Sequence, residues 1–472
     1  MGGKAAMLLV LGFSLIFLVF GNNFNSLTTR AVKNEASYYN ETMAHNIAIA
    51  GANMVANAVF MDKAWDDGYF KLPYQGGILN VYITNPSGYN SKVTICHKPG
   101  TRAEHTISAP PSIKDTLLNN GDYLGDCRGT SMDPNLVLIY AEGIFPDPDK
   151  CPPFITPDTS VVYVKLQPSS FAKYGNFYDR MHAIPATGDT FDGYFHVNNT
   201  MKTWGHPVFL DKVTSKGGLV MYNTKNPEFQ KGYTSGIDVK RPWDTTNFRK
   251  LGLNGGAVIR DTTKSGKRVD VEMEFKSDGT VKYRYRIFDG SPTWTPYKIQ
   301  PLSDLTSNGV IYIERGNLYV KGTVRGQATI VVTKNNKSGC GRIFQTDDLK
   351  YNTDPTKDPS SNDMLGLVAE GNIRLVYNDD TKHHDIITQA SLFSKNGSVG
   401  PDNRLVSNDG YLASWKILGG IIAHDVRVTA HYNSVGPYEG YKFVHKFDRR
   451  FLTRVPPHFP HAKNYEVVSW YE

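Results

Sequence analysis

The feature that most constrains this chain is an uncharged apolar stretch near its amino terminus, from Ala5 to Gly21. Its sequence is AAMLLVLGFSLIFLVFG, and only MGGK precedes it. As an α-helix these 17 residues rise roughly 26 Å, which is near the thickness of the hydrocarbon core of a bilayer and exceeds the apolar part of most signal peptides. We therefore expect a helix that enters a membrane.

The residues around the stretch predict that signal peptidase does not remove it and that it has a defined orientation in the membrane. Asn22 to Ser26 lack the small-x-small pattern that signal peptidase cuts. With Lys4 on the cytoplasmic side, the positive-inside rule places the C-terminal part of the chain outside the cytoplasm. We expect a single-pass protein whose lipid- or filament-facing residues are Leu8, Leu9, Leu11, Phe13, Leu15, Ile16, Phe17, Leu18 and Phe20.

The helix is expected to continue beyond the apolar stretch. No proline occurs before Pro73, and apolar or small residues recur every three, four or seven positions at Ala36, Met43, Ile47, Ala50, Met54 and Ala58. This predicts one helix of about 55 residues, roughly 80 Å long, from Lys4 to about Phe60. Its alanines and glycines allow neighbouring helices to approach closely. A membrane anchor with a helical stalk and a helix that assembles with other subunits fit this pattern equally well.

The N-terminus resembles that of PilX-type minor pilins over about the first 60 residues. The similarity lies in the string GGKAAMLLVLGFSLIFLVFG and in AHNIAIAGAN, from Ala44 to Asn53. The resemblance implies a bacterial inner-membrane helix that later packs into a type IV pilus or a related secretion pseudopilus, with other pilin or pseudopilin subunits as partners. It also implies prepilin cleavage after Gly3. Prepilins usually carry a glutamate at the fifth mature position, where this chain has Leu8.

The rest of the chain is expected to be mainly β. Aromatic residues make up 12% of the sequence, and 43 glycines and 26 prolines separate short apolar runs, which disfavours both disorder and helical bundles. Three short strands in the 24 residues from Gly309 to Val332 predict one coil of a parallel β-solenoid, with Met364–Val376 as the next coil. An antiparallel meander is the alternative, because glycine corners also form hairpins.

This pattern predicts a long N-terminal helix, transmembrane or pilin-like, followed by a β-rich, solenoid-like body. The expected domains are the helix over 1–62, a small β region over 70–160, a first β domain over 165–300 and a C-terminal solenoid-like domain over 301–472. From Phe171 to Glu472 the body resembles an uncharacterised extracellular β domain that follows PilX-type helices in environmental bacteria. The resemblance implies no catalytic residues. The segments in which it is most specific are Gly188–Asn198, Gly205–Phe209, Asp363–Leu367 and Phe447–Glu472.

A cysteine and histidine segment lies in the small β region, over residues 93–127. Thiolate and imidazole are preferred zinc ligands, so the candidate metal ligands are Cys96, His97, His105 and Cys127. Their spacing matches no standard zinc finger. The segment is similar to a Cys-His-x-Pro module of secreted bacterial proteins, in which two further histidines stand where this chain has Leu117 and Asn120. Because a metal centre here lacks these two ligands of the module, we prefer a Cys96–Cys127 disulfide in an oxidising compartment.

The sequence carries none of the strong catalytic signatures. It contains no His-Glu-x-x-His, no Gly-x-Ser-x-Gly and no phosphate-binding Gly-x-x-x-x-Gly-Lys-Ser/Thr. Asp189 and Asp192, near His196, are candidate acid and base of a glycan-active enzyme, but hydrogen bonding in a turn explains both aspartates. Two acidic groups are candidate cation ligands that solvated turns also explain, His383-His384-Asp385 and Asp347-Asp348.

These observations predict a non-enzymatic envelope protein without a cofactor. A net charge of +7 with interspersed signs gives no reason to expect nucleic acid binding. Because a body of about 400 residues is bulky for a repeating shaft subunit, we expect a minor, low-copy component of a type IV pilus or a related pseudopilus. The alternatives are a membrane-anchored adhesin that binds a surface glycan or mineral, and a glycan-active β-helix enzyme.

Overall fold

The chain divides into two compact units. The first consists of Met1–Pro168 together with Asn464–Glu472, and the second of Ser169–Lys463. The first unit therefore contains both the expected helix and the expected small β region, and the C-terminal residues return to it. The computed structural model describes residues 2–63, 65–85, 93–99, 101, 104–109, 111–124, 137–152, 155–223, 226–241, 245–263, 266–288, 293–406 and 410–471.

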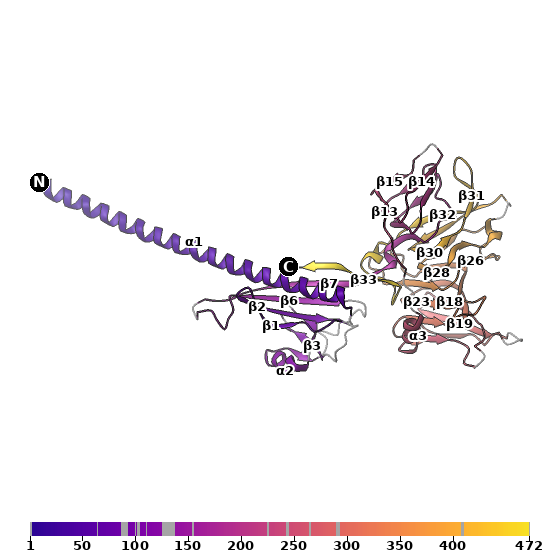
Figure 1. The fold of residues 1–472 in the computed structure, drawn as a ribbon, viewed down its shortest axis with the longest axis horizontal. Coiled ribbons are helices and arrows are strands. Elements are labelled where there is room, and N and C mark those ends of the chain that lie inside the picture. The colour runs from indigo at the N-terminus through magenta and orange to yellow at the C-terminus, as the bar shows by residue number, and fades with distance from the viewer. Residues whose placement is uncertain are drawn as a thin grey trace. The chain divides into compact units, whose positions relative to one another are not determined.

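The first unit begins with helix α1, from Gly2 to Met61, which confirms the long helix predicted from the sequence (Figure 1). Its second half is partly buried, and the buried face is centred about one residue further along the chain than the predicted stripe. Met43, Ala50 and Met54 lie at the edge of that face. The face itself consists of Ala44, Ile47, Ala48, Gly51, Ala52, Val55, Ala56 and Val59, spaced by three or four residues.

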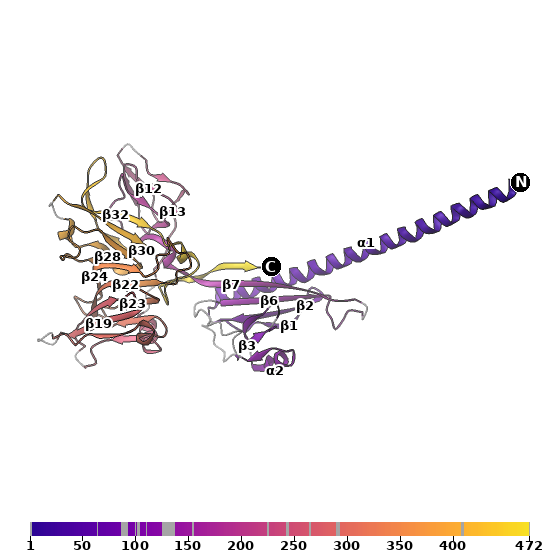
Figure 2. The same ribbon diagram turned by 180° about the vertical axis from the view of Figure 1, so that it is seen from behind.

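This face of α1 packs on a five-stranded sheet of order β1-β2-β6-β7-β33 (Figure 2). Neighbouring strands from β1 to β7 pair antiparallel. Inward-pointing side chains alternate along the strands and form the core with the helix, as Leu79, Val81 and Ile139 do. The bounds of the strands are β1 Tyr69–Tyr74, β2 Gly77–Thr84, β6 Val137–Phe145, β7 Asp158–Ser170 and β33 His461–Tyr471.

A small subdomain covers the other face of this sheet. Tyr82 of β2 and Tyr140 of β6, whose chain neighbours point toward α1, contact Ile95 and Ile107 in a second apolar cluster. The register of β3 against β4 is antiparallel and sets His97 opposite His105. The subdomain consists of β3 Val93–His97, β4 His105–Ala109, α2 Pro111–Asn119 and β5 Tyr123–Leu124.

The second unit is largely β, and most of its strands pair in parallel. A first run starts at β8 and ends at β16, with each strand pairing with the next. Its strands are β8 Tyr174–Tyr178, β10 Tyr194–Val197, β13 Val213–Ser215 and β16 Tyr233–Thr234. Shorter parallel pairs accompany it, formed by β9 Thr190–Phe191, β12 Val208–Phe209, β15 Glu228–Phe229, β11 Met201–Trp204 and β14 Leu219–Tyr222.

A second run of parallel strands leads from β17 to β30, and β30 pairs in parallel with β8. The chain thus begins in the middle of one continuous stack, reaches one end at β16, resumes at the other end with β17 and returns to the middle. The strands of this run are β17 Ala257–Ile259, β21 Val310–Ile313, β23 Gln327–Val332, β25 Met364–Ala369, β28 Ser391–Pro401 and β30 Ile421–Val426.

A further row of strands accompanies the second run. It pairs in parallel from β18 through β22 and β24 to β26 and β27, and from β27 through β29 to β32. The bounds are β18 Val269–Phe275, β22 Gly316–Val324, β24 Arg342–Tyr351, β26 Ile373–Leu375, β27 Ile386–Gln389, β29 Leu412–Leu418 and β32 Pro437–Lys446. The helices of the unit are α3 Thr245–Leu253 and α4 Leu302–Leu305.

The prediction that the three strands over Gly309–Val332 form one coil is wrong. Because β21 and β23 pair with each other in parallel, β23 belongs to the next layer, and the layer of β21 contains β22 as its second strand. β25 follows in the next layer, as the prediction for Met364–Val376 requires.

The structure does not show a regular solenoid. Layer lengths are unequal, since Phe195 pairs with Val213 but Ala328 with Leu365. Antiparallel hairpins interrupt the stack at β18, β19 Thr280–Ile287 and β20 Lys298–Pro301, and at β31 Ala430–Tyr432 and β32.

Candidate functional site

The first half of α1 carries the strongest functional signal in the molecule. All nine predicted lipid- or filament-facing residues, from Leu8 to Phe20, are between 52% and 74% exposed. Each such side chain gains about 1.5 to 3 kcal/mol when it leaves water for an apolar environment. Within the described part of the chain, α1 is the one helix long and apolar enough to span a membrane or to act as a signal sequence.

The apolar residues of this segment follow one another without a polar face. A helix that is apolar on all sides is stable only when it is surrounded completely, by lipid or by other helices. The segment Ala5–Gly21 therefore needs more than one flat contact surface. Both a membrane and the interior of a helical assembly satisfy this requirement.

A second exposed feature follows the apolar stretch and was missed by the sequence analysis. We call it the stalk stripe: Phe24, Leu27, Ala31 and Tyr38 lie on one side of α1 at spacings of three, four and seven residues. Phe24 is 73%, Leu27 65% and Tyr38 71% exposed. Thr29 and Lys33 occupy the opposite side of the helix, and Glu35, four residues after Ala31, is a charged residue on the same side as the stalk stripe. The signal that could have revealed the stalk stripe is the same periodicity that marks the helix further along the chain.

The stalk stripe ends where the sheet of the first unit begins to cover α1. The ring of Tyr39 packs edge-on against Phe145 of β6, with 5.8 Å between ring centroids. Close contact continues at Gly143, where a side-chain carbon, if one were present, would lie 2.1 Å from the carbonyl oxygen of Ala44 and 2.7 Å from the amide nitrogen of Ala48. The absence of a side chain at Gly143 lets the helix backbone touch the strand, which holds α1 firmly from Ala44 onward.

Among the predicted metal ligands, Cys96 is buried and disulfide-bonded. Cys127 lies outside the described residues, so its pairing with Cys96 stays a prediction, and Cys151 and Cys340 are free. A cysteine in a disulfide offers no thiolate to a zinc ion. Among the described residues, no group of three or more His, Cys, Asp and Glu side chains is arranged to hold a metal ion.

His97 is held by the subdomain itself. Its Nδ1 lies 2.5 Å from Oδ2 of Asp122, and the backbone N–H of Lys98 donates to Oδ1 of Asp122 at 2.9 Å. Lys98 in turn forms an ion pair of 2.6 Å with Glu142 and donates to the hydroxyl of Tyr140 at 3.0 Å. Burial alone would lower the pKa of Lys98, but the hydrogen bond and charge of Glu142 raise it. These contacts fasten the subdomain to the sheet.

The candidate acid–base residues have different partners. Asp189 accepts hydrogen bonds from the N–H of Ala186 at 2.8 Å and the hydroxyl of Tyr432 at 2.7 Å. Asp192 accepts from the N–H of Gly193 at 2.8 Å and of Phe447 at 3.0 Å, and forms an ion pair of 2.5 Å with Arg449. His196 is fully buried and contacts Thr214 and Asn198, and burial lowers its pKa. The structure thus ties Asp192 and His196 into packing contacts.

The two groups of candidate cation ligands, His383-His384-Asp385 and Asp347-Asp348, also have hydrogen-bond donors close by. Asp385 accepts from the N–H of Ser414 at 2.7 Å and pairs with Lys416 at 2.9 Å. Asp348 accepts from the N–H of Ile387 at 2.9 Å, and Asp347 lies 3.7 Å from the Nζ of Lys321. His383 and His384 precede Asp385 in a turn, and the His383 ring stacks on Tyr411 at 4.4 Å. Backbone and lysine donors therefore surround these carboxylates.

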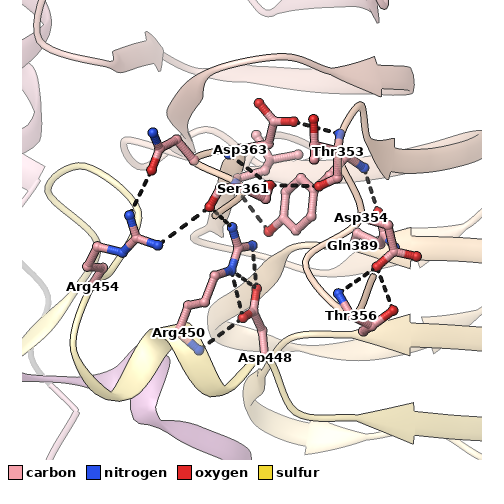
Figure 3. Close-up of polar contacts among 12 residues, drawn as sticks. Thr353, Asp354, Thr356, Ser361, Asp363, Gln389, Asp448, Arg450 and Arg454 are labelled. Atoms are coloured by element: carbon pink, nitrogen blue, oxygen red, sulfur yellow. Dashed lines mark hydrogen bonds and ion pairs between the residues drawn. The ribbon is translucent and has the colours of Figure 1, made fainter. Parts of the chain in front are cut away.

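Two of the strings that resemble the extracellular β domain meet in the structure, although they are far apart in the sequence (Figure 3). Arg450 donates to the carbonyl oxygen of Ser361 at 2.8 Å and pairs with Asp448 at 2.6 Å. Asp363 accepts from the N–H of Gly326 at 2.7 Å and of Thr353 at 2.8 Å. The strings at Asp363–Leu367 and Phe447–Glu472 thus contribute to one polar network that fixes loops of the second unit. Their role in this structure is packing.

Comparison of the chain with protein-family models, with curated proteins and with solved structures finds no match. The structure shows a long apolar N-terminal helix followed by a β-rich body.

Proposed function

We propose that the protein is a pilin-like subunit of the bacterial cell envelope, a minor component of a type IV pilus or a related secretion pseudopilus. In this proposal Ala5–Gly21 of α1 lies in the inner membrane before assembly. After cleavage following Gly3, α1 packs among the helices of other pilin or pseudopilin subunits. The β-rich body is presented outside the cytoplasm.

The observation that carries the proposal is the stalk stripe. A bilayer accounts for the exposed residues up to about Gly21, but Phe24, Leu27 and Tyr38 follow over about 14 further residues, or roughly 21 Å of helix. A stalk that only holds a body away from a membrane needs no apolar side. A helix that packs along a neighbouring helix needs one, and the polar side with Lys33 then faces away. The partner that fits is the α1-type helix of another subunit.

A pair of matched variants tests this proposal in cells that express the whole chain. Leu27→Ser with Tyr38→Ser removes two side chains of the stalk stripe, and Thr29→Ser with Lys33→Ser changes two residues on the opposite side. We expect both variants in the membrane fraction, because Ala5–Gly21 is intact in each. We expect only the control variant in sheared surface filaments, at a level near that of the unaltered protein.

Quantitative mass spectrometry of the filament and membrane fractions reads out this experiment. Equal recovery of the two variants in filaments would show that the stalk stripe has no role in assembly. Absence of the unaltered protein from filaments that contain other pilins would favour the alternative of a membrane-anchored surface protein. Deletion of Ala5–Phe20 gives a further expectation, a body that is released from the membrane and absent from filaments.

A further inference from the structure

The second unit contains a cavity of about 570 Å³ that the proposed function leaves without a role. It lies where the two runs of parallel strands meet, because Tyr178 of β8 and Ile421 of β30 both line it and these two strands pair with each other. This volume falls in the range of pockets that bind small molecules. A small ligand could therefore occupy it.

The wall of the cavity is mostly apolar and rich in aromatic rings. The ring of Phe191 contacts those of Phe195 and Phe443, with centroid distances of 5.1 Å and 5.9 Å. Trp415 also lines the wall, and its indole N–H already donates to Thr388 at 2.8 Å. The polar atom of this side chain is therefore used within the protein, and its ring is what the cavity meets.

One carboxylate lines this apolar cavity. Asp189 is only 8% exposed, and its two hydrogen bonds come from the N–H of Ala186 and the hydroxyl of Tyr432, both neutral donors. Among the described residues no cationic side chain forms an ion pair with it. Arg427 lines the same cavity, but its guanidinium donates to Asn403.

This arrangement is electrostatically incomplete. A buried carboxylate costs several kcal/mol relative to water unless a cation or several hydrogen bonds compensate it, and the carboxyl group has about four acceptor sites, of which two are used here. Burial accordingly raises the pKa of Asp189 to about 6. A cation that enters the cavity supplies the missing charge, and aromatic ring faces attract cations as well.

We propose that this cavity binds a small organic cation with an apolar body, such as an aryl-alkyl ammonium compound, whose ammonium group pairs with Asp189. The apolar part of the molecule packs against the aromatic wall. The inference does not depend on whether α1 assembles into a filament, because all the residues involved belong to the second unit.

Calorimetric titration of the full chain in detergent tests the proposal with two probes of equal shape, phenethylamine and 2-phenylethanol. We expect the amine to bind at least tenfold more tightly than the alcohol. In the variant Asp189→Asn, the amide retains an acceptor for Ala186 and a donor for Tyr432 but carries no charge. We expect the affinity for the amine to fall at least tenfold in this variant, and that for the alcohol to stay unchanged.

A second pair of variants separates the cavity from micelle partition and from misfolding. Val428 lines the cavity and is 52% exposed, so we expect Val428→Trp to occupy part of the cavity with a bulky ring at a position outside the packed core. Val435 is 83% exposed and does not line it, so Val435→Trp is the control. We expect amine binding to be lost in the first variant and retained in the second.

The pH dependence gives an independent readout. The other titratable groups that line the cavity are Tyr178, Arg427 and Tyr432, and burial raises the pKa of both tyrosines. Neither tyrosine therefore changes protonation between pH 5 and 7, whereas Asp189 does. We expect the affinity for the amine to fall about tenfold between pH 7 and pH 5.

The outcomes are decisive in each direction. Binding that depends on Asp189, Val428 and pH supports the proposal. Equal affinity for amine and alcohol overturns the assignment of a cation, and equal binding to Val428→Trp and Val435→Trp overturns the assignment of the cavity. Failure of both probes to bind the unaltered protein overturns the proposal as a whole.

Discussion

At the scale of single residues, the backbone approach at Gly143 decides how α1 is held in the first unit. Any side chain at this position meets the helix backbone at Ala44 and Ala48, which cannot move aside as a flexible side chain can. A lone glycine in a strand is visible in the sequence, but its contact with a helix about 100 residues earlier in the chain is not. The sequence therefore predicted that the helix exists and could not predict this contact.

The variant Gly143→Ala is expected to destabilise the first unit by about 2 kcal/mol, because overpacking at this site forces helix and strand apart. Gly218→Ala is the control, since a side-chain carbon at Gly218 would meet nothing within 4 Å. Urea unfolding of the full chain in detergent, monitored by limited proteolysis of the first unit, measures the difference in stability between the two variants. A midpoint for Gly143→Ala equal to that of Gly218→Ala would contradict the tight contact.

Asp189 gives a prediction for the stability of the second unit. Its pKa is raised from 3.8 to about 6 in the folded protein, so folding favours the protonated form. The stability that Asp189 contributes when protonated is present below about pH 4 and is lost as the pH rises through about 6, so ionisation of Asp189 costs the folded state about 3 kcal/mol at pH 7. We expect Asp189→Asn to raise the melting temperature at pH 7 and to leave it nearly unchanged at pH 4. A variant less stable than the unaltered protein at pH 7 would contradict this account.

At the scale of elements, local sequence patterns predicted what depends on local structure. The proline-free N-terminus and the spacing of its small and apolar residues predicted the long helix α1. The layer assignment over Gly309–Val332 failed because it depends on which strands pair, and short apolar runs with glycine corners do not specify their partners. The stalk stripe was missed because its apolar residues are spread through a segment that is otherwise polar.

The subdomain that carries Cys96 gives a prediction at this scale. We expect Cys96 to be linked to Cys127, and Cys151 and Cys340 to react with an alkylating reagent once the protein is unfolded. Peptide mapping without reduction measures the linkage. The variant Cys127→Ser should lower the stability of the subdomain by about 2 to 4 kcal/mol through the lost cross-link. A peptide that joins Cys96 to Cys151 or to Cys340 would show the expected pairing to be wrong.

At the scale of the whole molecule, the arrangement depends on contacts between distant parts of the chain. The strands β8 and β30 pair although about 245 residues separate them, and the cavity with Asp189 draws its wall from both runs. The C-terminal strand β33 completes the sheet that begins with β1. No periodicity within one segment carries this information, which explains why neither the cavity nor the return of the chain was predicted.

The central claim is that α1 is an assembly helix and not only an anchor. The measurement that tests it most directly is the N-terminal sequence and location of the native protein, by mass spectrometry of sheared surface filaments and of washed membranes. Our account predicts a chain in the filaments that begins at Lys4, after cleavage following Gly3. An uncut chain that begins at Met1 and occurs only in membranes, in cells whose filaments contain other pilins, would contradict it.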